Sequence, residues 1–168
     1  MQYFELKKSE HVKNVIVPIL QEITMPIINV DALEDYSIGY YERKGIETTD
    51  LLTAPLFMVS EEIKELMRLY DESILFKGIQ LFSKDSEYVP ALYYAVCPFR
   101  ADCLHKDVRI NPNGTVNEVV LDKTRIPKRD IFQIDGLVQQ KIVVSLRVAV
   151  SLLRRSLYGI GLKEIQVR

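Results

Sequence analysis

Phe57-Met58-Val59-Ser60 and Ile142-Val143-Val144-Ser145 are two copies of one short pattern, and each leads into the same series of elements. The first copy continues through a helix-like segment to Gly78-Ile79-Gln80-Leu81, and the second through a similar segment to Glu164-Ile165-Gln166-Val167. Each copy is a β-rich run, a serine, apolar residues at helical spacing and a second β-rich run. The sequence therefore predicts two strand–helix–strand modules that share one plan.

The two predicted helices begin at Ser60 and Ser145 and extend over residues 60–71 and 145–157. A serine in this position can accept a hydrogen bond from a backbone N–H of the first turn. Apolar residues on one face predict that the first helix lies at the surface (Ile63, Leu66, Met67 and Tyr70). Apolar residues around most of the circumference predict that the second is buried on more than one side (Leu146, Ala149, Val150, Leu152, Leu153 and Leu157). We therefore expect Leu153→Ala to destabilise the protein far more than Leu69→Ala.

Further strands are expected where β-favouring residues lie between turn signals, at residues 2–6, 77–82, 90–97, 116–121, 131–134 and 163–167. Asn111-Pro112-Asn113-Gly114 is a turn signal that joins residues 107–110 to 115–121 as a hairpin. No linker separates the two repeat copies, at about 55–84 and 140–168, and each module needs a partner to cover its apolar face. The sequence predicts an α+β fold in which residues 1–168 form one compact unit of two pseudo-repeated modules with additional antiparallel strands.

The composition is that of one soluble globular domain, with 168 residues, 48% hydrophobic and 27% charged. A net charge of −1 argues against a nucleic-acid-binding protein, and no apolar run approaches the roughly 18 residues of a membrane span. The N-terminus has no apolar signal region, and two cysteines make no disulfide framework. We expect a cytoplasmic protein that binds neither nucleic acid nor membrane.

Charge is divided unevenly along the chain. Residues 1–84 hold 14 Asp and Glu against 9 Lys and Arg, whereas residues 85–168 hold 9 against 13. This asymmetry predicts an acidic face and a basic face if the two halves fold separately, and no net dipole if they interleave. The basic group Lys123, Arg125, Lys128 and Arg129 could contact phosphate, but without interleaved aromatic residues it is more typical of a solvated loop.

Cys97, Cys103 and His105 come closest to a metal or nucleophile site. Zinc needs three or four convergent ligands, and this spacing is not that of a standard zinc knuckle. Cys103 and His105 would share one face of a strand, but no third group orients them for nucleophilic catalysis. The glycines form no phosphate-binding loop, and neither Ser60 nor Ser145 lies in a Gly-x-Ser-x-Gly motif. We therefore predict no catalytic residue, metal or cofactor, and a protein that is not an enzyme.

A tyrosine-rich segment supplies the predicted partner-binding residues, Tyr36, Tyr40, Tyr41, Glu42 and Arg43. Tyrosine and arginine are enriched at the energetic centres of protein interfaces. We expect Tyr40 and Tyr41 to contribute to binding and little to stability. The alternative is that at least two of the tyrosines lie in the core.

From Tyr93 onward the chain carries a set of framework segments: Tyr93-Tyr94-Ala95-Val96, Asp102-Cys103, Val119-Val120-Leu121-Asp122, Asp130-Ile131-Phe132, and Val143-Val144-Ser145 before a leucine-rich helix, a glycine-containing turn and a strand. In these segments it resembles immunity family eleven, a bacterial immunity-protein family of polymorphic toxin systems that was long a domain of unknown function. Leu104-His105-Lys106 and Leu162-Lys163 depart from the family pattern. The resemblance implies a small cytosolic protein that binds a cognate toxin domain and blocks it, without catalytic residues. The alternative is a small ligand-binding domain or enzyme with a cleft between the pseudo-repeats.

Overall fold

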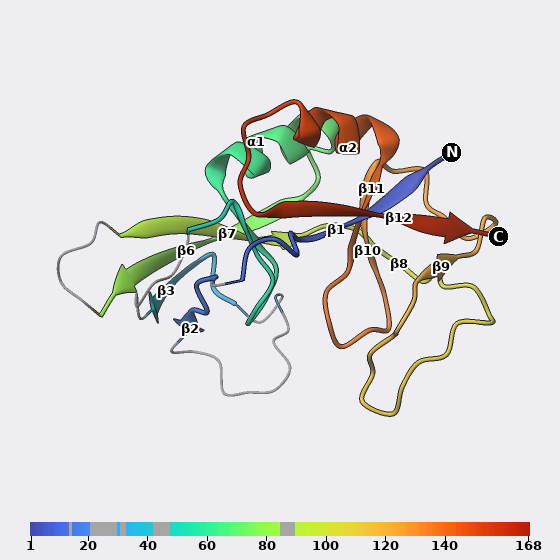
Figure 1. Cartoon of the computed structure of the whole chain (residues 1–168), viewed down its shortest axis with the longest axis horizontal. Coiled ribbons are helices and arrows are strands. Elements are labelled where there is room, and N and C mark those ends of the chain that lie inside the picture. The colour runs from blue at the N-terminus through green and yellow to red at the C-terminus, as the bar shows by residue number, and fades with distance from the viewer. Residues whose placement is uncertain (14, 21–29, 31–32, 42–47, 85–89) are drawn as a thin grey trace.

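The computed structural model describes residues 1–13, 15–20, 30, 33–41, 48–84 and 90–168. Within them, two helices lie over two six-stranded mixed sheets (Figure 1). The helices are α1 (Glu61–Tyr70) and α2 (Leu146–Leu153). The first sheet has the order β8-β10-β11-β1-β12-β9, and the second has the order β2-β3-β6-β7-β5-β4.

The first sheet consists of β1 (Tyr3–Lys8), β8 (Arg100–Ala101), β9 (Val120–Leu121), β10 (Ile131–Ile134), β11 (Ile142–Ser145) and β12 (Ile160–Val167). The second consists of β2 (Ile19–Leu20), β3 (Tyr36–Tyr41), β4 (Leu51–Leu52), β5 (Met58–Val59), β6 (Leu75–Ser83) and β7 (Ala91–Cys97). The predicted α+β class is confirmed. The expected strand at 116–121 is limited to β9, and a single bridge from Ile110 to Val116 closes the predicted turn.

Both predicted strand–helix–strand modules are present, and they have the same topology. In the first module β5 and β6 lie on either side of β7, which is antiparallel to both. In the second β11 and β12 lie on either side of β1, again antiparallel to both. The outer neighbours also correspond, because β4 and β10 pair antiparallel with the first strand of their module, and β3 and β9 pair parallel with the last.

Strand register fixes the repeat residue by residue. Ile79 is paired with Tyr93 in the first module, and Ile165 is paired with Tyr3 in the second. The predicted equivalence of residues 78–81 with 164–167 is therefore confirmed. Register also makes Tyr93 equivalent to Tyr3, and Asp50, which precedes β4, equivalent to Asp130, which precedes β10.

The two helices lie side by side above the junction of the sheets (Figure 1). The Tyr70 hydroxyl of α1 is hydrogen-bonded to Ser151 Oγ of α2 at 2.5 Å. One core beneath them takes side chains from both helices and both sheets (Leu6, Val59, Ile63, Met67, Val96, Val144, Val148 and Leu152 among them). The two modules thus share one core, as expected of a single compact unit. No helix in the described ranges is long and apolar enough to cross a membrane.

Ser60 and Ser145 occupy the positions that begin the helices, as predicted, but neither side chain caps its helix. Their backbone N–H groups donate to the carbonyl oxygens of Asp50 and Asp130, at 2.8 Å in each case. Ser145 Oγ donates to Asp130 Oδ1 at 2.6 Å, whereas the buried Ser60 Oγ has no hydrogen-bond partner among the described residues. The serines mark an equivalent strand-to-helix corner, and the predicted capping bond is wrong.

The prediction that α2 is buried on more than one side is also wrong. Its buried residues are Val148, Ala149 and Leu152, while Leu153 is 69% exposed and comparable to Leu69 at 78%. The helix ends at Leu153, short of the expected residue 157. In the described part of the chain α2 packs mainly on α1 and on β11 and β1 of the first sheet, and its other side faces solvent. Leu153→Ala is therefore not expected to cost more stability than Leu69→Ala.

Candidate functional site

Part of the second sheet has an apolar face that neither of the two described helices covers. α1 lies over the row formed by Val59, Tyr94 and Gly78, where the Lys64 ammonium sits 3.9 Å from the centre of the Tyr94 ring. Farther along β3, β6 and β7 the same face continues beyond α1, and Figure 1 shows these strands projecting past the helix pair. We call this region the open sheet face, formed by Ile19, Tyr36, Ile38, Tyr40, Phe82 and Leu92.

Cross-strand pairing brings these side chains together. Ile19 is paired with Tyr40 and Tyr40 with Phe82, and the Tyr40 and Phe82 ring centres are 6.3 Å apart. In the next row Gln80 lies between Ile38 and Leu92. All six except the half-buried Tyr40 are between 37 and 55% exposed. Exposed apolar residues are common singly, but a contiguous group of this size is typical of an interaction surface.

Tyr36 is held in place on this face. Its ring lies against Gly78, where a Cβ atom would approach the ring to 2.7 Å. Its hydroxyl donates to Gln80 Oε1 at 3.0 Å. A glycine at this position therefore allows the ring to lie across the sheet. An aromatic side chain fixed before binding loses little conformational entropy when a partner covers it.

The predicted partner-binding residues have different locations. Tyr36 and Tyr40 lie on the open sheet face, whereas Glu42 and Arg43 lie outside the described residues. Tyr41 is only 2% exposed and packs in the core cluster on the opposite face, because successive side chains of a strand alternate between faces. The prediction that Tyr41 is a surface residue is wrong.

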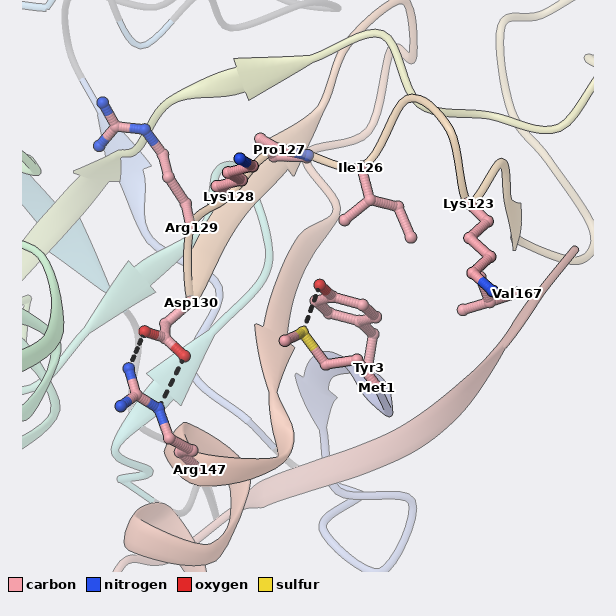
Figure 2. Close-up of a pocket in the computed structure, with 10 residues that line it drawn as sticks. All are labelled: Met1, Tyr3, Lys123, Ile126, Pro127, Lys128, Arg129, Asp130, Arg147 and Val167. Carbon is pink, nitrogen blue, oxygen red and sulfur yellow. Dashed lines mark hydrogen bonds and ion pairs between the residues drawn. The ribbon is translucent and has the colours of Figure 1, made fainter.

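A hollow of about 740 Å³ lies in the other half, at the start of β1 and the end of β12 (Figure 2). Most of its lining consists of apolar side chains (Tyr3, Ile126, Pro127 and Val167) and cationic side chains (Lys123, Lys128, Arg129 and Arg147). Two arginines of the predicted basic group are ion-paired, Arg129 with Asp71 at 2.8 Å and Arg125 with Asp102. The volume is within the range of small-molecule sites.

Asp130 is the acidic residue that lines this hollow, and its carboxylate is hydrogen-bonded to residues at the start of α2. Arg147 donates to both of its carboxylate oxygens, and Ser145 donates to Oδ1. These hydrogen bonds lower the pKa of Asp130, with that from Arg147 contributing most. Burial and the nearby Asp130 charge raise the pKa of Tyr3. Asp130 is therefore an ionised structural group and is poorly placed to accept a proton near neutral pH.

The equivalent space in the first half is filled by the chain itself. Tyr93, the counterpart of Tyr3, donates its hydroxyl to the Thr49 carbonyl at 2.7 Å, and burial raises its pKa to about 12. Gly159 packs against Thr49 so closely that a Cβ atom would come within 2.4 Å of that side chain. A hollow at this place is thus a property of the second half alone among the described residues.

The cysteine and histidine group does not form a metal centre in the part of the chain that is described. Cys103 is fully buried, and burial raises the pKa of its thiol to about 11, which opposes a nucleophilic thiolate. His105 Nδ1 accepts a hydrogen bond from the Asp107 backbone N–H at 3.3 Å. Cys97 lies in the other sheet, on β7.

Neither a protein-family model nor a curated protein matches this sequence.

Proposed function

We propose that this chain is a non-enzymatic binding protein of the immunity type, which neutralises a cognate bacterial toxin domain in the cytoplasm by covering it with the open sheet face. The toxin partner is what the resemblance from Tyr93 onward implies. The observation that carries the binding proposal is the contiguous apolar surface of Ile19, Tyr36, Ile38, Tyr40, Phe82 and Leu92, which neither α1 nor α2 covers.

The arrangement of this face supports a protein partner better than a small ligand. It is a strand-built surface on which Tyr36 and the Tyr40–Phe82 pair lie on either side of Ile38, and none of the four hollows described for this part of the chain is lined by it. Interfaces between proteins concentrate their binding energy in such aromatic and aliphatic anchors. Acidic residues beside Tyr36, Glu34 and Asp35, are exposed and would supply part of a polar rim.

The alternative function is a small ligand-binding domain or enzyme that uses a cleft between the two modules. The hollow at their junction, lined by Thr53 and Phe57 from one half and Glu5 and Gln140 from the other, measures about 210 Å³. This is below the roughly 300–1,000 Å³ of most ligand sites. Gln140 also ties the two halves together there, since its side chain accepts from the Phe57 N–H at 3.1 Å and donates to the Val96 carbonyl at 3.2 Å.

Co-expression with the protein encoded by the adjacent gene tests the proposal. We expect that protein to be toxic, and the present chain to restore growth. Ile38→Asp should abolish protection because it places a charge at the centre of the open sheet face. Leu75→Asp is a matched control, since Leu75 is a 68% exposed leucine on β6 whose side chain points to the opposite face of the same sheet. A toxic neighbour against which the wild-type chain gives no protection would contradict the immunity function.

A further inference from the structure

One flank of α2 is apolar although it faces solvent. Leu146, Val150 and Leu153 are spaced so that they form a single stripe along the helix. They are 43, 36 and 69% exposed. We call these three residues the α2 flank. They are the same residues whose apolar character led to the expectation of a buried helix.

The internal repeat provides a control within the molecule. With Ser60 aligned to Ser145, the buried residues of α1 and α2 match, Ile63 with Val148 and Met67 with Leu152. The α1 counterparts of the α2 flank are Glu61, Glu65 and Arg68. There Lys64 forms ion pairs with Glu61 at 2.6 Å and with Glu65 at 3.4 Å. The first module thus carries charged side chains at the positions that are apolar on α2. We conclude that this strand–helix–strand fold does not require apolar residues on the α2 flank.

The surroundings of the α2 flank are basic. α2 carries no acidic residue, and arginines lie at both of its ends (Arg147, Arg154 and Arg155). Arg147 is bound to Asp130, and Arg155 donates to the Ser151 carbonyl at 2.8 Å. Arg154 is exposed and makes no ion pair within the described ranges. A partner that covers the apolar stripe would therefore meet a positively charged rim.

We infer that the α2 flank is a docking surface for an amphipathic helix of another protein, one whose apolar stripe is bordered by aspartate and glutamate. The stripe spans eight residues, about 10 Å, which matches two turns of a partner helix. A second copy of this chain fits poorly, because antiparallel pairing of two α2 helices would bring their arginines together. Three side chains also fall far short of the roughly 1,200–2,000 Å² buried in a stable dimer. The α2 flank is in the other half from the open sheet face, so this inference does not rest on the proposed function.

A displayed library of amphipathic helices with a fixed apolar stripe and randomised flanking positions tests the inference on the full chain. The key variant replaces the α2 flank by its α1 counterparts, Leu146→Glu, Val150→Glu and Leu153→Arg. Leu69→Glu is the matched control, because Leu69 is an exposed leucine of α1 outside the stripe. We expect the selected helices to carry an excess of acidic residues, to bind the triple variant about tenfold more weakly or worse, and to bind Leu69→Glu like the wild type.

Two results would overturn the inference. The first concerns the selection, which contradicts the inference if it yields no binders or if the binders show no acidic bias. Binders that retain their affinity for the triple variant contradict it as well. The other is a concentration-dependent dimer in sedimentation of the wild-type chain that the triple substitution removes, since a second copy would then be the occupant. The single variant Leu153→Arg, at the most exposed of the three positions, keeps the test valid if the triple variant does not fold.

Discussion

The two halves of the molecule share a topology but differ in where they expose apolar side chains. In the first half the helix has a charged outer flank (Glu61, Glu65 and Arg68), and the sheet beyond it is apolar. In the second half the helix has an apolar outer flank (Leu146, Val150 and Leu153), and Glu164 and Gln166 of β12 stand where the first half has Gly78 and Gln80. The core positions correspond and the surfaces do not. Exposed apolar residues that one module has and the other lacks are not required by the shared fold. These residues are therefore the candidates for binding.

The largest effect is expected at the two faces of β3. Tyr41→Ala should lower the free energy of unfolding by about 3–5 kcal/mol, because it removes a large buried ring from the core. Tyr36→Ala should cost less than about 1 kcal/mol, because its ring is half exposed and contributes mainly a cross-strand contact. Urea denaturation of both variants measures the difference. Equal losses would show that the open sheet face is part of the core.

A similar contrast is expected between neighbouring leucines of α2. Leu152→Ala should destabilise the protein by about 2–5 kcal/mol, since Leu152 is fully buried like its counterpart Met67. Leu153→Ala should change the free energy of unfolding by about 0.5 kcal/mol or less, since Leu153 is exposed like its counterpart Arg68. The comparison uses the midpoint of urea unfolding. A larger loss for Leu153→Ala would contradict the description of the α2 flank as a free surface.

The two corner serines, Ser145 and Ser60, should respond differently to replacement by alanine. Ser145→Ala should destabilise the protein by about 1 kcal/mol, because it breaks the hydrogen bond to Asp130. Ser60→Ala should leave stability unchanged or raise it by about 1 kcal/mol, because the hydroxyl that it removes is buried and has no partner in the described part of the chain. Thermal unfolding of the two variants provides the measurement, and a loss at Ser60 as large as that at Ser145 would contradict the structural difference between the corners.

The smallest effect is a dependence on pH that comes from Asp130. Because hydrogen bonds lower its folded-state pKa below the ordinary value of 3.8, Asp130 contributes stability that is present above that value and is lost as the pH falls through the lowered pKa. The Asp130→Asn variant should therefore lose stability relative to the wild type at pH 7, and the difference should shrink on acidification below about pH 4. A wild-type advantage that grows as the pH falls would have the wrong sign.

The sequence was sufficient to predict the modules, since alternation in the strands and a serine at each corner are local signals. It did not reveal the central strand of each module, because β7 follows the first module whereas β1 lies at the start of the chain. The apolar residues around α2 do not by themselves indicate which positions pack on the rest of the protein and which face solvent. Alignment of the two copies could have done so, since it places Leu153 opposite the charged Arg68.

The candidate site was only partly predictable for the same reason. Tyr36 and Tyr40 stood out by residue type, and the period-two alternation of Tyr36, Ile38 and Tyr40 could have assigned Tyr41 to the other face. Phe82 and Leu92 join the face only through pairing with strands remote in the sequence. Such contacts depend on register between segments, which local patterns do not specify.

The central claim is that the open sheet face binds a protein partner. Titration calorimetry of the proposed partner, the toxin domain encoded by the adjacent gene, against the wild-type chain, Ile38→Asp and Leu75→Asp tests it most directly. The account predicts that Ile38→Asp weakens binding by about 30-fold or more, the effect of losing an interface anchor, while Leu75→Asp binds like the wild type. Equal affinity of all three proteins, with their unfolding midpoints unchanged, would contradict it.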